Sequence, residues 1–417
     1  MSSFNINLHE AIFSLSNALD LVGVVQIQHG KRVAFMATEC GKMLGWNEEK
    51  LDNLFQAAIL HDCGVSKTSV HKKLAQFAWE NEKNHCQIGA ELLKRTPLLK
   101  HLSDCILHHH THWSELESLD LPWEVKITAN CIYMVDRVDV LSLGFMKTDP
   151  NILININKIR DKIVEKRGSW FHPELVDVFL DVSSSLAFWL SLERDHVYGY
   201  VSSWIAHDIT KEIDFQDLKA LAQVFSHIVD AKSTFTKEHS DGVADLSRYL
   251  GELCHLSEHT CDMLEIAGLL HDLGKLRVPD ELLDKNSKLT AEEFLTIQRH
   301  SFDTYDIIKN IKGFEEISEW AAQHHERVDG SGYPYRTTQK KLSLEARIVA
   351  VADVFQALAQ DRPYRAGLAP EEILAILKQQ VSEGQLDANL VNIVENHLFD
   401  CWRVALSALE SSPFKGM

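Results

Sequence analysis

The sequence predicts an all-α protein built from two copies of one helical domain. Apolar residues recur at helical spacing in segments 8–22 (LHEAIFSLSNALDLV) and 217–231 (DLKALAQVFSHIVDA) instead of alternating as they do in strands. Glycine (19 residues) and proline (9 residues), which interrupt helices, are sparse in a chain of 417 residues. An internal repeat with a period near half of the chain predicts the duplication.

The repeat is carried by histidine motifs. His29 in QHGKRVA aligns with His239 in EHSDGVA, and the pair His61-Asp62 aligns with His271-Asp272, both at an offset of 210 residues. Later motifs align at offsets of 215 and 217 residues, which pairs His85 with His300, His109 with His324, His110 with His325 and Asp136 with Asp353. The slow drift in offset indicates short insertions in loops, where they cost little.

We place the domain boundary between residues 205 and 206. A chain of 417 residues is long enough for two domains that each bury a core. No stretch rich in glycine, serine or proline separates the two copies, so we expect domains 1–205 and 206–417 to meet through helices instead of a flexible tether.

Composition excludes several classes of protein. A net charge of −18 argues against a nucleic-acid polymer as partner, whereas a small anionic ligand stays compatible because metal ions reverse the local potential. The eight cysteines form no CxxC pair, which predicts reduced thiols that act as core residues and not as ligands. The sequence has no cleavable leader and no apolar run near the ~18 residues of a membrane helix, so we expect a cytoplasmic protein without a membrane partner.

The stretch from 271 to 334 carries the chemistry. It opens with HDLGK and closes with HHERVDGSGYP. A histidine followed at once by an aspartate offers a nitrogen ligand and a bridging carboxylate on one helical turn, which suits two cations. With residues before and after this stretch, the potential ligands number seven, all nitrogen or oxygen: His239, His271, Asp272, His300, His324, His325 and Asp353.

This ordered set, with Lys275 and the GYP triplet, resembles the HD-GYP branch of the HD superfamily from about Phe215 to the C-terminus. The resemblance implies tandem HD-domain helical bundles and a metal phosphodiesterase that opens a bacterial cyclic dinucleotide, either cyclic di-GMP (c-di-GMP) or 3′,3′-cyclic GMP-AMP (3′,3′-cGAMP). It also implies that Asp272 bridges two metals. The first would be held by His239, His271 and Asp353, and the second by His300, His324 and His325.

The resemblance further implies catalytic and substrate-binding residues. Asp272 and Lys275 would be catalytic, with Lys275 acting as a point charge on a phosphate oxygen, unless it is an ordinary surface lysine. Gly332, Tyr333 and Pro334 would form a shaped loop at the mouth of the site. The arginines of DRPYR would contact phosphate or base, although an ordinary exposed arginine is the alternative for each: Arg362 and Arg365.

We expect two divalent metal ions. Family members with a third metal carry acidic residues at two positions that are occupied here by Phe235 and Gln356. Ligands that are all nitrogen or oxygen accept iron, manganese, nickel or zinc, and the sequence does not choose among them.

The first copy keeps the ligands but departs elsewhere. Val65 stands where the second copy has Lys275, and Lys67 comes two residues late, on a different helical face. Thr111 to Trp113 replace the start of the glycine-rich loop, and no GYP follows. We therefore predict a degenerate regulatory or structural copy that could still hold metal, and we leave open a homodimer or an interface between the two copies.

The predicted function is hydrolysis of 3′,3′-cGAMP or c-di-GMP to the linear dinucleotide. Another HD-type nucleotide phosphohydrolase is an alternative, but it leaves His300, His324 and His325 unexplained. A non-catalytic metal- or ligand-binding signalling scaffold is a second alternative, against which the intact Lys275 argues. A general metallophosphodiesterase is a third.

Overall fold

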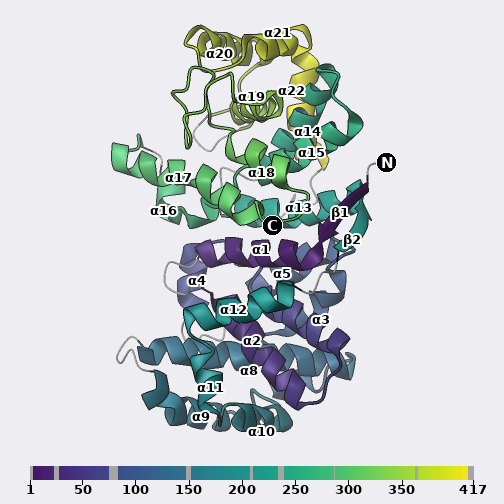
Figure 1. The fold of residues 1–417 in the computed structure, drawn as a ribbon, viewed down its shortest axis with the longest axis vertical. Helices are drawn as coiled ribbons and strands as arrows, with labels where there is room; N and C mark the ends of the chain where they lie inside the picture. Colours follow the sequence, from purple (N-terminus) through teal and green to yellow (C-terminus); the bar gives the residue numbers. More distant parts are fainter. Residues whose placement is uncertain are drawn as a thin grey trace. The chain divides into compact units, whose positions relative to one another are not determined.

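The structure is a computed structural model that describes residues 3–22, 28–74, 83–146, 152–206, 210–232, 239–285, 287–361 and 365–411. The chain divides into two compact units. The amino-terminal unit is Leu8–Ile209, and the carboxy-terminal unit combines Met1–Asn7 with Thr210–Met417. Helices dominate both units, which confirms the predicted helical fold (Figure 1).

The carboxy-terminal unit contains the only two strands of the described residues. Its elements are β1 (Ser3–Asn7), β2 (Thr210–Asp214), α13 (Phe215–Asp230), α14 (His239–Leu253), α15 (Glu258–Leu270), the 3-10 turn η3 (Leu273–Arg277), α16 (Asp280–Leu283), α17 (Ala291–Ile308), α18 (Glu315–Ala322), α19 (Leu344–Ala359), α20 (Pro370–Ser382), α21 (Ala388–Asn396) and α22 (Leu398–Ser411).

The two strands were not part of the all-α prediction. They pair antiparallel, with Phe4 opposite Ile213, and both side chains are buried. The Phe4 ring also stacks on His259, with ring centroids 5.0 Å apart. Each strand leads directly into a helix, and five residues per strand are too few to give a clear alternating pattern in the sequence.

Helix α14 forms the centre of the carboxy-terminal unit, packed against α15, α19 and α22. Gly268 permits the close approach of α15, because a Cβ there would lie 2.6 Å from the Ala244 Cα. Side-chain caps stabilise the start of several other helices. Ser257 caps α15, Ser343 caps α19, and Thr290 forms a capping box with Glu293 at the start of α17.

The amino-terminal unit consists of helices in the described residues. Its elements are α1 (Leu8–Val22), α2 (His29–Met43), α3 (Glu48–Ile59), α4 (Thr68–Leu74), α5 (Asn84–Lys94), η1 (Lys100–Leu102), α6 (Ser103–His108), α7 (Trp113–Leu116), α8 (Trp123–Met146), η2 (Ile152–Asn155), α9 (Ile156–Val164), α10 (Pro173–Val182), α11 (Leu186–Leu190) and α12 (Arg194–Ile205). Helix α2 is central and packs against α3, α8, α10 and α12.

The predicted repeat reappears as a repeat of elements. His29 begins α2 as His239 begins α14, and the His-Asp pairs follow α3 and α15 in the same way. None of the described helices combines the length with the apolar character that crossing a bilayer requires.

Candidate metal centre

In the carboxy-terminal unit the seven predicted ligands come together from separate elements. His239 begins α14, the pair 271–272 follows α15, His300 lies in α17, the pair 324–325 follows α18, and Asp353 lies in α19. Their donor atoms form three overlapping groups, within each of which all atoms lie no more than 4.8 Å apart: His239, His271 and Asp353; His271, Asp272 and His324; His300, His324 and His325.

Asp272 lies between two sets of histidines. Its Oδ2 is 3.3 Å from His271 Nε2 and 3.8 Å from His239 Nε2. Its Oδ1 is 3.5 Å from His300 Nε2 and 3.9 Å from His324 Nε2. Donor atoms that share one ion at ~2.0–2.2 Å lie ~3.0–3.5 Å apart. The shorter distance at each oxygen falls in this range, so the two oxygens of Asp272 face two different pairs of histidines.

Backbone carbonyls orient the histidines. His271, His300 and His324 each donate from Nδ1 to the carbonyl three residues earlier, at 2.7, 2.6 and 2.6 Å. His239 donates from Nδ1 to the Gln356 side-chain oxygen at 2.5 Å. Each hydrogen bond fixes the tautomer and turns the Nε2 lone pair toward the centre, which is the usual support of a metal-binding imidazole.

The pKa values of two of the histidines favour neutral imidazoles that can bind a metal. Burial lowers the pKa of His300 to about 3 and that of His325 to about 4, so both are neutral at pH 7. Burial also opposes the charge on His271, but Asp272 outweighs it and raises the His271 pKa to about 9. A divalent ion would therefore compete with a proton at His271.

Two buried polar atoms of this seven-residue cluster have no hydrogen-bond partner among the described residues. They are His271 Nε2 and Asp272 Oδ1, and both face the centre of the cluster. A buried polar atom without a partner costs ~1–3 kcal/mol, a cost that a bound cation would remove. The residues present therefore fit a divalent metal centre.

The sequence predicted that the His-Asp pair lies within one helical turn. In the structure the pair lies just after the last residue of a helix. His271 is the C-cap of α15, and Asp272 precedes the turn η3. Gly274 lets η3 press against α17, since a Cβ there would lie 2.0 Å from the His300 carbonyl oxygen. Thr304 joins the two segments by accepting from Gly274 N and donating to the His271 carbonyl oxygen.

Lys275 lies in this same turn. Its Nζ is 2.5 Å from Asp272 Oδ2, and its side chain is 20% exposed. The ammonium group therefore touches the bridging carboxylate while it stays accessible from solvent.

The GYP loop lies against the ligands. Tyr333 N donates to the His325 carbonyl oxygen at 3.2 Å, and the two rings have centroids 4.8 Å apart. Gly332 is required here, because a Cβ would lie 2.5 Å from that same carbonyl oxygen. The loop is held by Glu326, whose carboxylate accepts from the Tyr335 and Thr337 amides. Sequence reasoning missed Glu326, although its position directly after the histidine pair was the available signal.

Of the two predicted arginines, the structure describes one. Arg362 and Phe235 lie outside the described residues. The Arg365 guanidinium donates to the carbonyl oxygens of Ala357 and Leu358 at the end of α19. Its proposed contact with substrate stays a prediction.

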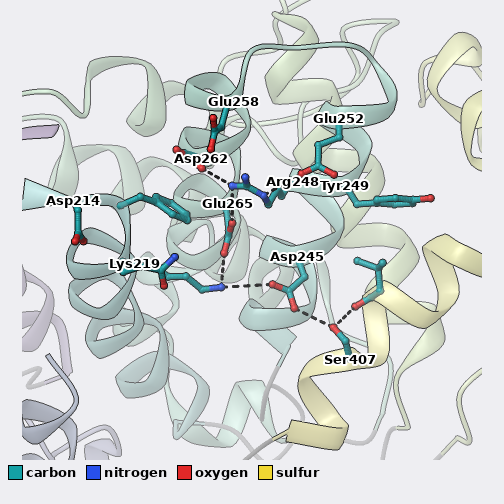
Figure 2. A pocket seen from close by; sticks show the side chains of 13 residues that line it. Asp214, Lys219, Asp245, Arg248, Tyr249, Glu252, Glu258, Asp262, Glu265 and Ser407 are labelled. Atoms are coloured by element: carbon teal, nitrogen blue, oxygen red, sulfur yellow. Dashed lines mark hydrogen bonds and ion pairs between the residues drawn. The ribbon is translucent and has the colours of Figure 1, made fainter. Parts of the chain in front are cut away.

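A separate cavity of about 560 Å³ lies in the same unit (Figure 2). None of the seven ligand residues lines it. Its buried carboxylates already have cationic partners, since Arg248 pairs with Asp262 and Glu265, and Lys219 also pairs with Glu265. The cavity therefore offers no converging set of metal ligands.

The amino-terminal unit builds a second cluster of the same kind. Asp62 Oδ2 is 3.4 Å from His61 Nε2, and Asp62 Oδ1 is 3.4 Å from His85 Nε2. His29 Nε2 is 3.3 Å from Asp136 Oδ1. Gly64 repeats the role of Gly274, since a Cβ there would lie 2.0 Å from the His85 carbonyl oxygen.

The two clusters differ in their cations. In the amino-terminal unit, Val65 is buried where the other cluster has a lysine. Arg137 instead donates from Nε and Nη2 to Asp136 Oδ2, at 3.0 and 2.8 Å. Its side chain is only 2% exposed.

Comparisons with known proteins agree with the repeat. The HD domain model matches residues 27–142, and a second HD domain model matches residues 223–390. The 3′3′-cGAMP-specific phosphodiesterase 1 of Vibrio cholerae is 36% identical over 400 residues, covering 94% of this chain and 92% of the relative. The cyclic di-GMP phosphodiesterase response regulator RpfG of Xanthomonas campestris is 37% identical over 172 residues, covering 41% of this chain and 44% of the relative.

A solved structure shows the same fold. The crystal structure of a cyclic GMP-AMP specific phosphodiesterase of V. cholerae superposes with a TM-score of 0.61 at 22% identity, covering 99% of both chains. The tandem arrangement and the family predicted from the ordered histidines are thereby confirmed: the chain belongs to the HD-domain family of bacterial cyclic dinucleotide phosphodiesterases.

Proposed function

We propose that this protein hydrolyses 3′,3′-cGAMP to the linear dinucleotide, and that residues 206–417 form the catalytic domain. The observation that carries the proposal is the bridging position of Asp272, with Lys275 and the GYP loop beside it. Residues 1–205 keep the ligands but lack the accessible lysine and the GYP loop, so we assign them a regulatory or structural role.

The choice of 3′,3′-cGAMP rests on coverage. The V. cholerae phosphodiesterases named 1 and 3 for this substrate align with 94% and 96% of the chain. Relatives named for cyclic di-GMP, RpfG and PA4108 of Pseudomonas aeruginosa, align with 41% and 43%. Similarity that includes the amino-terminal copy thus favours 3′,3′-cGAMP.

The cofactor would be two divalent ions drawn from iron, manganese, nickel and zinc. One would be held by His239, His271 and Asp353, the other by His300, His324 and His325, with Asp272 shared. Such ions bind phosphate oxygens and lower the pKa of water toward ~7, which supplies the nucleophile.

The chain's own residues position and neutralise the substrate. Lys275 places a positive charge next to Asp272, where a phosphoryl oxygen would approach. Gly332 and Tyr333 would form one wall of the substrate site. The hydrogen bonds from the loop amides to the Glu326 carboxylate, and from Tyr333 N to the His325 carbonyl oxygen, hold this wall against His325. Pro334 ends the triplet, and Arg362 and Arg365 remain candidate contacts for phosphate or base.

The substrate proposal is tested with purified, metal-loaded protein and equal concentrations of 3′,3′-cGAMP, c-di-GMP and cyclic di-AMP. Chromatography should show linear GMP-AMP forming fastest. Faster turnover of c-di-GMP would contradict the substrate choice and leave the reaction class intact. No turnover of any cyclic dinucleotide, by protein that retains its metal, would contradict the function itself.

The number of ions is tested by anomalous diffraction at the metal edge. We expect two strong peaks between His271, His300 and His325. Gln356 supports this number because it is neutral and its side-chain oxygen already accepts from His239. Three peaks of comparable height at this centre would contradict a dinuclear site.

A further inference from the structure

The amino-terminal cluster contains a sulfur atom that the carboxy-terminal cluster lacks. Cys86 Sγ lies 3.5 Å from His85 Nε2 and 4.0 Å from His109 Nε2. The corresponding residue in the second copy is Ser301, whose Oγ lies 3.3 Å from His300 Nε2. At the same point of two similar clusters, one copy therefore presents a soft donor and the other a hydroxyl.

The distances around this sulfur approach those of a tetrahedral zinc site. With Zn–N of ~2.0–2.1 Å and Zn–S of ~2.3 Å, the donor atoms of such a site lie ~3.3–3.6 Å apart. His85 Nε2 is 3.3 Å from His109 Nε2, 3.4 Å from Asp62 Oδ1 and 3.5 Å from Cys86 Sγ. His109 Nε2 is farther from Asp62 Oδ1 and from Cys86 Sγ, at 3.8 and 4.0 Å. Cys86 Sγ therefore lies within 4.0 Å of both histidine nitrogens, and Asp62 Oδ1 lies within 3.8 Å of both.

The same donors are buried, and one of them has no hydrogen-bond partner among the described residues. Asp62 Oδ1 is buried without a hydrogen-bond partner among the described residues, and so is His61 Nε2 beside it. Cys86, His85 and His109 are all buried. His109 donates from Nδ1 to the Ile106 carbonyl oxygen at 2.6 Å, which leaves its Nε2 to accept a metal.

Charge also favours an ion on Asp62. The other carboxylate of the cluster, Asp136, already has the buried Arg137 guanidinium on its Oδ2. Asp62 instead shares its two oxygens among histidines. A cation at this point would meet an anionic oxygen that no arginine or lysine of the described residues neutralises.

We propose that the amino-terminal unit binds zinc between Asp62, His85, Cys86 and His109. Four protein ligands close the coordination sphere, which is the mark of a structural zinc site. The ion would tie together the end of α3, the start of α5 and the end of α6. The thiolate selects zinc over manganese or magnesium, so the two copies differ in metal preference as well as in catalysis.

The test begins with a variant whose carboxy-terminal centre is removed, His271→Ala with Asp272→Ala. After zinc loading and gel filtration we expect about one zinc per chain. Cobalt loading should give the near-ultraviolet absorption of a thiolate bound to cobalt. Adding Cys86→Ser, which installs the residue of the other copy, should remove that absorption and weaken zinc binding by at least ~10-fold.

A matched control and a second measurement keep the outcome interpretable. Cys105→Ser changes another buried cysteine of the same unit and should alter neither signal. Zinc-edge anomalous diffraction from wild-type crystals should give a peak beside His85. Loss of all zinc from the parent variant, with no such peak in the wild type, would overturn the site. Retained affinity in Cys86→Ser would overturn thiolate ligation and indicate His110, which lies in the same donor group. Neither result depends on hydrolysis, which the wild-type assay measures separately.

Discussion

The two copies share a ligand geometry but differ in the solvent exposure of the cationic side chain that contacts a ligand aspartate. Lys275 touches Asp272 with a side chain that is 20% exposed, whereas Arg137 touches Asp136 with a side chain that is 2% exposed. In each cluster a cation thus touches one of the two aspartates of the aligned ligand set, but the lysine is more exposed than the arginine. We therefore expect metal binding and substrate contact to be separable properties of this fold.

The group that orients the first histidine differs as well. His239 donates to the neutral Gln356 amide, while His29 donates to Asp139, which also pairs with Arg32. Gly242 stands at the position of Arg32, and a Cβ there would come within 2.9 Å of the Gln356 side chain. Burial opposes protonation of His29, but Asp136 and Asp139 raise its pKa to about 10. The same need for an acceptor is met by an amide in one copy and by a carboxylate-arginine pair in the other.

The largest expected difference in hydrolysis is between variants that lack the His-Asp pair of one copy or of the other. His271→Ala with Asp272→Ala should abolish cyclic dinucleotide hydrolysis, because the bridging carboxylate is lost. His61→Ala with Asp62→Ala should leave most of it, since that copy lacks the accessible lysine and the GYP loop. Turnover is measured by chromatography, with circular dichroism to establish that both variants fold. Equal loss in two folded variants would break the division of labour.

Replacing Lys275 is expected to have a smaller effect on turnover. Lys275→Ala should lower turnover by roughly 10²-fold, the scale for losing one positioned electrostatic group. Metal content should persist, because the lysine is not a ligand. Elemental analysis beside the assay distinguishes the two roles. Turnover at the wild-type level would make Lys275 an ordinary surface residue.

Replacing Gln356, whose side-chain amide orients His239, should have a smaller effect still. Gln356→Ala should reduce metal affinity or turnover by ~10-fold, the lower end for a group that supports a metal-binding histidine. Asp139→Ala is the matched change in the other copy, and it should leave hydrolysis unchanged. Comparable losses of hydrolysis from both variants would indicate that the amino-terminal cluster takes part in the reaction.

Helical spacing predicted the helical fold, and the order of the histidines predicted which side chains come together in each unit, because a repeat of helices fixes which helix ends meet. The same pattern did not reveal β1 and β2, whose pairing joins residues about two hundred positions apart. Partners that depend on packing were also missed. Arg137 was not singled out, although the sequence places it directly after Asp136, because adjacency in a helix does not tell which side chain is buried. Cys86 was assigned to the core, and its approach to His85 depends on the fold of α5 and α6.

The smallest effect is expected from a double variant of the amino-terminal copy. This variant removes Arg137 and places a lysine at the position that corresponds to Lys275. Val65→Lys with Arg137→Val supplies a lysine three residues after Asp62 and the valine that stands after Asp353. Arg137→Val leaves Asp136 buried without its arginine, at a cost of ~3–5 kcal/mol, so circular dichroism must first establish that the variant folds. In a background with His271→Ala and Asp272→Ala, we expect hydrolysis to stay undetectable, because no loop equivalent to 332–334 lies beside His110. Hydrolysis of 3′,3′-cGAMP by this variant would show that the position of one cation, and not the missing loop, keeps the first copy inactive.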